Sequence, residues 1–467
     1  MAQARSAAST HAVARVQVIG PARLGATAIV ALAARGIDAR AVAAPGGDGE
    51  EVIAWALEAP PTVAAAAQLA VACARAAAGG RPVCLFAPAP RGTGRQAIER
   101  AAALAYLRAH GAAIAHDVDA WLEAIVLLVR FGLPGGPRAA VIAPDGSWLE
   151  AQAAALAGED VRPVLAGADE PTDVVLYDPA LGAPPRSTPG MHVPMIARGE
   201  LADDDTPPAL HGARAALGAV ALLGRAAERI AVGLGPAPRT ASAELAIDDE
   251  RLRRQLDKLV GTRIGDHETK VLLSAYGVPI TRQALATTPS AAVKLARRAG
   301  FPVEIKPWGH DVPSEPAGCP VEKDVTSDAR VRQAFAAVLA AAGKAFTERT
   351  AVIVRETPPP GRDVSVQLIE LPALGWTVVL DAPGAPALAA APAPLRLIDA
   401  EALAAHVVAS RASDPEPDRA GLANVLRRVS HLVVDLEARL ASIELPRVVV
   451  GGRGARTLVV DAAATLR

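Results

Sequence analysis

The chain has 467 residues with a formal net charge of -1, and 51% of its residues are hydrophobic. Its near-neutral charge and its 3% of aromatic residues exclude the basic field and the stacking side chains of a nucleic-acid-binding protein. The longest apolar run, residues 62–78, is interrupted by Gln68 and Arg75, so it predicts a buried helix and not a membrane span. Three widely spaced cysteines form no metal motif, which is typical of a reducing compartment, and we expect a cytoplasmic protein of roughly three domains.

The N-terminal half repeats one pattern, in which a short Val/Ile-rich run leads through a proline-containing turn into an alanine-rich helix. The pattern occurs at residues 15–36 and again at 138–159. Further apolar runs at 82–88 and 172–179 predict more strands with helices between them. Strands that alternate with helices are typical of parallel sheets, so we predict two small α/β domains of flavodoxin-like type.

The C-terminal half has a different pattern. Helical periodicity stops at Gly277 and at Gly300, and several of the apolar runs that follow are adjacent and hairpin-like. This predicts an α+β domain with substantial antiparallel sheet. All six lysines lie between residues 258 and 344, although arginine is the usual basic residue elsewhere in the chain. The predicted organisation is a disordered tail at 1–13, flavodoxin-like subdomains at 14–135 and 136–232, a linker at 233–249 and the α+β domain at 250–467.

Several stretches resemble one known family. Residues 268–311 read ETKVLLSAYGVPITRQALATTPSAAVKLARRAGFPVEIKPWGHD, which resembles the start of the ATP-grasp domain of ADP-forming acyl-CoA synthetases. Residues 82–125 are similar to the segment that carries the phosphohistidine in that family, and residues 132–146 to the segment after it. The resemblance therefore implies two succinyl-CoA-ligase-like flavodoxin subdomains followed by an ATP-grasp domain.

The resemblance implies a nucleotide site in the α+β domain. A lysine at the end of a strand, here Lys306, would supply a compact ammonium group to the phosphates. Asp311 and Gly318 match the loop that follows, and Glu356 stands near the hinge where adenine and ribose would be held. The expected cofactors are ATP or ADP with Mg²⁺. A second interpretation stays open, in which Lys306 is a strand-end lysine that reaches solvent.

The resemblance also implies a metal site near the C-terminus. Asp461 keeps the family's aspartate, whereas the family's asparagine ligand is replaced by Glu444 or by Leu445, depending on the register of the match. A glutamate is an oxygen ligand that Mg²⁺ accepts. We therefore expect Glu444 and Asp461 as the metal ligands.

Other positions depart from the family, and no catalytic residue is assigned. The nucleophilic histidine falls on Arg100, and arginine cannot carry a phosphoryl group through a relay. His110 and His116 lie nearby but match the segment after the nucleophile. The two turns that would cradle phosphate contain Pro21 and Pro144, which lack an N–H donor.

Three hypotheses follow from this combination. The first is a catalytically silent relative of ADP-forming acyl-CoA synthetases, retained as a subunit, regulator or scaffold. The second is an active acid–thiol ligase, consuming ATP, a carboxylate and CoA, in which a partner chain supplies the CoA domain and the phosphohistidine. The third is a nucleotide-binding sensor. Because about 14 residues precede the first predicted strand, we expect no CoA site on this chain alone, and we expect a protein partner or a homo-oligomer.

Overall fold

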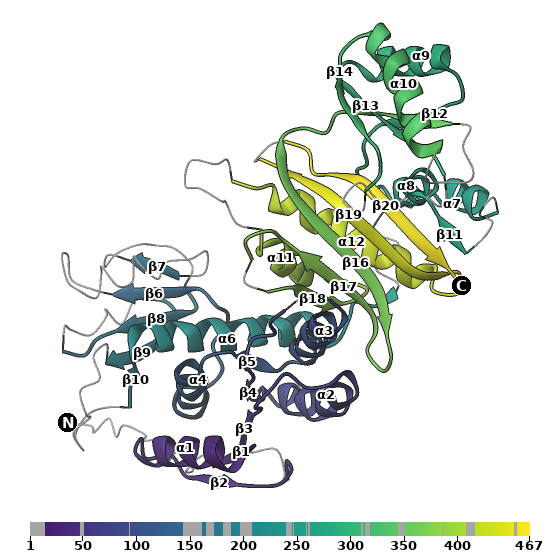
Figure 1. The fold of residues 1–467 in the computed structure, drawn as a ribbon. Coiled ribbons are helices and arrows are strands. Elements are labelled where there is room, and N and C mark those ends of the chain that lie inside the picture. Colours follow the sequence, from purple (N-terminus) through teal and green to yellow (C-terminus); the bar gives the residue numbers. More distant parts are fainter. Residues whose placement is uncertain are drawn as a thin grey trace, which may run out of the picture. The chain divides into compact units, whose positions relative to one another are not determined.

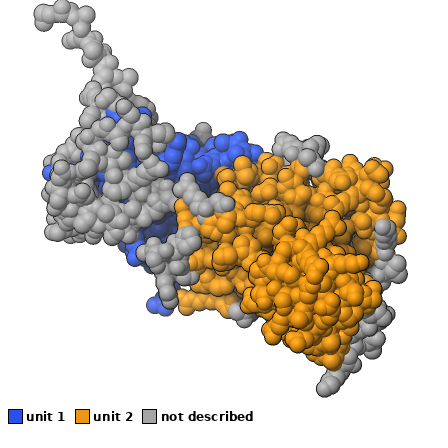
Figure 2. All heavy atoms as spheres, turned by 90° about the horizontal axis from the view of Figure 1, so that it is seen from above, with its two compact units in different colours: residues 1–90, 103–235 blue, residues 91–102, 236–467 orange. Residues whose placement is uncertain are grey.

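The structure is a computed structural model, and it forms two compact units that are described separately below (Figures 1 and 2). Unit 1 comprises Met1–Pro90 and Ala103–Gly235, and unit 2 comprises Arg91–Ala102 and Pro236–Arg467. The residues that the structure describes are 15–46, 51–92, 94–142, 161–164, 172–180, 188–196, 208–239, 245, 247–257, 259, 262–309, 312, 318–343, 351–385, 387–407, 416–452 and 455–467. The predicted tail at 1–13 and the predicted helix after residue 146 lie outside them.

Unit 1 begins with a parallel sheet, which in the described residues has the strand order β2-β1-β3-β4-β5. Its strands are β1 (Val16–Ile19), β2 (Ala39–Ala41), β3 (Val52–Ala56), β4 (Cys84–Phe86) and β5 (Ala113–Ala115). The helices between them in the chain are α1 (Ala22–Ala33), α2 (Val63–Ala78) and α3 (Arg95–Ala109), and residues 95–102 of α3 belong to unit 2. The chain moves first to one side of β1 and then to the other, which is the doubly wound flavodoxin-like order.

The second parallel sheet of unit 1 has the order β10-β9-β8-β6-β7 within the described part of the chain. Its strands are β6 (Ala139–Ile142), β7 (Val161–Val164), β8 (Val174–Tyr177), β9 (Met191–Ile196) and β10 (Leu210–His211). Helices α4 (Val118–Arg130) and α6 (Ala213–Val232) pack together and share one buried core with strands of both sheets. The prediction of two flavodoxin-like parallel sheets is confirmed. The predicted boundary at 135/136 falls between α4 and β6, and the domain limits themselves stay a prediction.

Unit 2 contains a larger antiparallel sheet with the order β11-β20-β19-β16-β17-β18, counted over the described residues. Its strands are β11 (Arg263–Ile264), β16 (Gly361–Leu371), β17 (Gly375–Asp381), β18 (Ala389–Pro392), β19 (Leu440–Gly451) and β20 (Leu458–Leu466). Helices α7 (Asp249–Leu256), α8 (Asp266–Ala275), α11 (Leu397–Ala404) and α12 (Arg419–Asp435) form one hydrophobic core with it.

A smaller antiparallel sheet of unit 2 has the order β12-β15-β13-β14 among the described strands (Figure 1). It consists of β12 (Gln283–Ala286), β13 (Val303–Pro307), β14 (Glu322–Val325) and β15 (Val352–Glu356). Helices α9 (Pro289–Ala299) and α10 (Asp328–Gly343) pack on one of its faces, where Val303, Ile305, Val352 and Val354 form the core. The predicted α+β architecture with antiparallel sheet is therefore confirmed.

The helix ends explain how β12 and β13 are placed. Gly277 follows α8 at φ +66° and Gly300 follows α9 at φ +88°, so each glycine adopts the left-handed conformation that ends a helix at low cost. Both predicted stops are confirmed. The Thr288 hydroxyl accepts a hydrogen bond from Ala291 N and caps α9 at its start.

Two short segments join the small sheet to the large one. After α8, residues 279–281 run beside β20, where Val459 N donates to Pro279 O at 2.9 Å and Thr281 N donates to Val459 O at 3.1 Å. The second connection, residues 357–360, leads from β15 to β16 with the sequence Thr-Pro-Pro-Pro. Among the helices of the described residues, none combines the length and apolarity that crossing a membrane requires.

Candidate functional site

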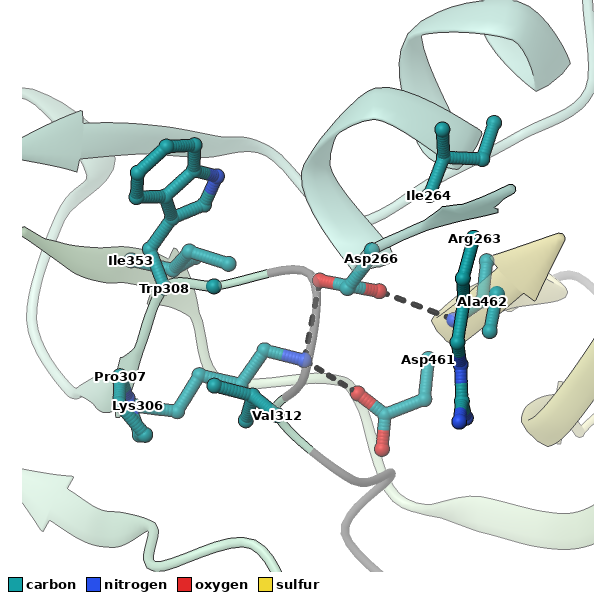
Figure 3. Close-up of a pocket in the computed structure, with 13 residues that line it drawn as sticks. Arg263, Ile264, Asp266, Lys306, Pro307, Trp308, Val312, Ile353, Asp461 and Ala462 are labelled. Atoms are coloured by element: carbon teal, nitrogen blue, oxygen red, sulfur yellow. Dashed lines mark hydrogen bonds and ion pairs between the residues drawn. The ribbon is translucent and has the colours of Figure 1, made fainter. Parts of the chain in front are cut away.

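Buried charges gather where the small sheet of unit 2 faces α8 and β20 (Figure 3). In β13 the side chains alternate, so Val303 and Ile305 face the helices while Glu304 and Lys306 face the other way. Arg355 lies directly opposite Glu304 on β15 and therefore shares that face. Across from them stand Asp266 and Lys270 of α8 and Asp461 of β20. We call these six described residues the ion cluster: Asp266, Lys270, Glu304, Lys306, Arg355 and Asp461.

Lys306 is the predicted phosphate lysine, and its ammonium group is bound within the ion cluster. Its Nζ lies 2.6 Å from Asp461 Oδ1 and 3.0 Å from Asp266 Oδ2 (Figure 3). Only 4% of Lys306 is exposed, so the interpretation of a lysine that reaches solvent is wrong. Burial lowers the pKa of Lys306, but the carboxylates of Asp266 and Asp461 outweigh burial, and the pKa lies above its ordinary value.

Arg355 connects the small sheet to β20. Its guanidinium donates from Nε to Glu304 Oε2 at 2.7 Å and from Nη1 to Asp461 Oδ1 at 2.9 Å. Nη1 also donates to Val460 O at 3.1 Å, and Arg355 has no exposed surface. One rigid side chain thus holds a carboxylate of its own sheet and two acceptors of the other sheet.

Lys270, the member of the ion cluster in the second turn of α8, is also completely buried. Its Nζ lies 3.2 Å from Asp266 Oδ1 and donates to Thr281 Oγ1 at 3.0 Å and to Gln283 Oε1 at 2.8 Å. Burial lowers the pKa of Lys270 to about 8, although the Asp266 carboxylate acts in the opposite direction.

The ion cluster is electrically balanced at neutral pH. Burial raises the pKa of Asp266, but Lys270 and Lys306 lower it more, so it stays below its ordinary value. Burial acts in the same way on Asp461, and Lys306 and Arg355 hold its pKa well below the usual range. With Glu304 paired to Arg355, three negative groups face three positive groups. The cluster therefore has no surplus positive charge to offer an incoming phosphate.

The space beside Lys306 is small. Among the described residues, Lys306, Asp266, Asp461, Trp308 and Ile353 help to line a pocket with a cavity volume of about 20 Å³ (Figure 3). That volume is close to the space that one water molecule occupies. Among the described residues, this space is far smaller than a nucleotide.

Of the other predicted nucleotide residues, Glu356 is not brought to Lys306. Glu356 follows Arg355 on β15, so its side chain points to the opposite face, where its Oε1 accepts from Arg282 N at 2.9 Å. Gly318 is exposed at φ +99°, and Asp311 lies outside the described residues. The roles given to these three residues stay predictions.

The two predicted metal ligands share a face of the large sheet. Glu444 lies opposite Ala463, and Asp461 lies two residues from Ala463 on β20, so both carboxylates point to the same side. Leu445 is completely buried in the core and cannot be a ligand. Glu444 is exposed, Asp461 is already held by two cations, and no group of three His, Cys, Asp or Glu in the described residues could hold a metal. The role of Glu444 and Asp461 as Mg²⁺ ligands therefore stays a prediction.

The position matched to the nucleophilic histidine lies in a regular helix. Arg100 is half-buried in the second turn of α3. His116 follows β5 and has both ring nitrogens engaged, Nδ1 with Ala87 O at 2.7 Å and Nε2 with Arg108 Nη2 at 2.8 Å. Burial is the main reason why the pKa of His116 lies below its ordinary value. His110 Nδ1 donates to Tyr106 O at 2.7 Å.

The first predicted phosphate turn is filled by protein. Gly20 has φ +152°, and a Cβ atom there would lie 2.6 Å from Ala56 O, so the turn between β1 and α1 presses against the end of β3. Pro21 stands at the N-cap of α1. The second predicted turn, with Pro144, lies outside the described residues.

Sequence reasoning did not identify Asp266, Lys270, Glu304 or Arg355 as members of the site. A signal was present for three of them. Glu304 and Lys306 put charges at alternate positions of an apolar strand, which marks a face that another part of the chain must neutralise. Asp266 and Lys270 stand four residues apart in α8, which is the spacing of an ion pair on a helix.

The sequence of unit 2, which contains the ion cluster, matches a known protein family. Residues 258–466 match the ATP-grasp domain family, so the C-terminal part of the chain carries an ATP-grasp domain. The resemblance predicted for this region is confirmed.

The curated relatives are ADP-forming ligases. The chain is 26% identical over 218 residues to the acetate–CoA ligase [ADP-forming] II subunit beta of Pyrococcus furiosus, which covers 44% of this chain and 92% of that protein. It is 27% identical over 117 residues to the 4-hydroxybutyrate–CoA ligase [ADP-forming] of Nitrosopumilus maritimus, which covers 25% of this chain and 17% of that protein. The chain is therefore related to ADP-forming acyl-CoA synthetase subunits.

Solved structures with similar parts include the dinucleotide-forming acetyl-coenzyme A synthetase 1 of Ca. Korarchaeum cryptofilum in complex with coenzyme A, Ca-AMPCP and HgCl+. The identity is 25%, the TM-score is 0.42, and the match covers 46% of this chain and 98% of that one. A second structure from the same organism, ACD1 in complex with coenzyme A, is 26% identical with a TM-score of 0.42 and covers 47% of this chain and 100% of that one.

Proposed function

We propose that this chain is a catalytically silent relative of ADP-forming acyl-CoA synthetases that works as a subunit, regulator or scaffold. The observation that carries the proposal is Arg100. It takes the place that the resemblance gives to the phosphorylated histidine, and it lies in a continuous helix. A guanidinium stays protonated at any physiological pH and has no lone pair with which to attack an acyl phosphate.

The hydrogen bonds of His116 support the view that it does not replace the missing nucleophile. Phosphorylation needs a ring nitrogen with a free lone pair, and His116 has a partner within 2.8 Å on each nitrogen. Because Arg108 can only donate, Nε2 accepts and Nδ1 carries the proton toward Ala87 O. This pattern supports a structural role for His116.

A protein partner fits this proposal. The Pyrococcus furiosus relative is named as a subunit, and it matches 44% of this chain. The remaining parallel sheets of unit 1 would then serve assembly. We place CoA on no residue of this chain.

A second candidate is a nucleotide-binding sensor. It is favoured by Lys306 and Asp461, which face each other from the two sheets of the ATP-grasp domain at 2.6 Å. In such a sensor the sheets would separate to admit ATP or ADP, without covalent chemistry.

The test is a search for covalent phosphate and for ligase activity. The wild-type chain, Arg100→His and His116→Asn are incubated with Mg·ATP, acetate and CoA, and acid-labile phosphohistidine and acetyl-CoA are measured. The Pyrococcus furiosus ligase serves as the positive control. We expect neither product from the wild-type chain. Stoichiometric phosphohistidine in the wild-type chain would disprove the proposal, and its loss in His116→Asn would locate it at His116.

A further inference from the structure

The ion cluster joins two sheets that an ATP-grasp domain must hold apart to admit a ligand. Glu304, Lys306 and Arg355 belong to the small sheet, whereas Asp266, Lys270 and Asp461 belong to α8 and β20. Lys306 and Arg355 both contact the same oxygen, Asp461 Oδ1, at 2.6 Å and 2.9 Å. That carboxylate is therefore doubly held by cations of the facing sheet.

Lys306 and Arg355 hold Asp461 in different ways. The Lys306 ammonium ends a flexible stem and can exchange one oxygen ligand for another. The Arg355 guanidinium is a rigid fork, and Glu304 fixes its orientation through contacts of 2.7 Å to Nε and 2.6 Å to Nη2. This orientation directs Nη1 to Asp461 Oδ1 and to Val460 O across the gap. Arg355 is thus the member of the cluster that fixes the distance between the sheets.

We propose that Arg355, oriented by Glu304, is an autoinhibitory latch that keeps the cleft of this ATP-grasp domain closed to nucleotide by holding Asp461 and the backbone of β20. The inference rests on the proposed function for the identity of the cleft and adds how access to it is regulated. The cavity of about 20 Å³ at Lys306 is the result of the closed latch. Only molecules whose latch is open can bind nucleotide, so a small open fraction lowers the apparent affinity of the protein for nucleotide.

The test removes the latch without changing the charge of the cluster. The double variant Glu304→Gln with Arg355→Met deletes one acid and one base, so Asp266 and Asp461 still balance Lys270 and Lys306. Replacing a buried ion pair by uncharged side chains of similar volume is commonly neutral for stability. The matched control is Arg297→Met with Asp328→Asn, which deletes an ion pair between α9 and α10 on the outer side of the same sheet.

Binding of Mg·ATP and Mg·ADP is measured by calorimetry on the three full-length proteins, and folding is checked by circular dichroism. We expect weak binding by the wild type and by the control, and binding at least about tenfold tighter by the latch variant, because the open fraction rises. A folded latch variant with the affinity of the wild type would overturn the proposal.

If the double variant does not fold, the nucleotide affinity of Arg355→Lys tests the latch proposal instead. This variant keeps the charge but cannot reach Glu304, Asp461 and Val460 O together, so we expect an intermediate gain in affinity, and no gain would overturn the latch. The two proposals fail separately. Phosphohistidine on the wild type would disprove the silent relative, whereas an absence of gain on unlatching, with no phosphohistidine, would disprove the latch alone.

Discussion

Each unit buries ionised side chains, but it does so in a different form. Among the described residues of unit 1, Arg35 after α1 contacts the buried Glu123 of α4 at 2.8 Å, and Glu123 also accepts from His211 N at 2.9 Å. Unit 2 has the ion cluster, in which most members depend on two others. Removing Arg35 together with Glu123 deprives backbone groups such as the His211 N–H of a partner but leaves no unpaired charge from the pair, whereas the loss of one cluster member unbalances the charge of the others. A pair of this kind serves packing, while a network between two sheets also controls their separation.

The largest effect is expected from Asp461→Ala. The change leaves Lys306 and Arg355 without their shared carboxylate in a buried place, which should reduce the free energy of unfolding by about 3–5 kcal/mol. Urea unfolding followed by circular dichroism measures it. Asp363→Ala on β16 is the control, because the Asp363 carboxylate is 55% exposed in its pair with Arg447. A loss under about 1 kcal/mol for Asp461→Ala would show that the cluster is not a network.

The next effect is a dependence of stability on pH. Lys270 has a pKa of about 8 in the folded chain, whereas an unfolded lysine titrates near pH 10.4. Between these values the unfolded state binds more protons, so the free energy of unfolding should rise with pH, by about 3 kcal/mol over the whole window. Urea unfolding at several pH values measures the rise, and Lys270→Met should remove it. An equal rise in that variant would assign the effect to other groups.

A smaller effect is expected in unit 1. Glu123→Ala leaves Arg35 and the His211 N–H without their acceptor, which should cost about 2 kcal/mol in the free energy of unfolding. Burial and Arg35 lower the pKa of His211 while Glu123 raises it, so the variant should also lower that pKa further. Urea unfolding and an NMR titration of His211 measure the two changes. An unchanged pKa would mean that Glu123 does not act on the imidazole.

The smallest effect is expected at the surface. Arg297→Met removes an ion pair whose arginine side chain is 66% exposed, so the free energy of unfolding should change by less than about 1 kcal/mol. The same urea experiment measures it. A loss as large as that of Glu123→Ala would contradict the contrast between buried and exposed pairs.

Local signals were sufficient for the fold and for part of the candidate site. Gly277 and Gly300 end helices by a conformation that depends on the residue itself, so their positions followed from the sequence. Lys306 stood out as a lysine at the end of an apolar strand. The side to which each strand residue points was harder to predict, because both faces of β15 are buried. Glu356 was therefore assigned to the nucleotide side, whereas its neighbour Arg355 occupies that side.

The other residues of the candidate site could not be predicted, because their partners are distant in the sequence. Arg355 is 51 residues from Glu304 and 106 residues from Asp461, and nothing in the local sequence of β15 indicates either contact. Lys306 and Asp461 are separated by 155 residues. Such contacts depend on how two sheets face each other, and this arrangement is a property of the folded chain and not of any one motif.

The two connections between the sheets of unit 2 would guide any separation of those sheets. One connection, residues 279–281, is held to β20 by two backbone hydrogen bonds. The other, residues 357–360, contains three consecutive prolines, which form a stiff extended rod. Because this connection is stiff, the small sheet with α9 and α10 would rotate as one rigid body. Its motion should be detectable as a change in distance between probes on α10 and α12, with little change within either part.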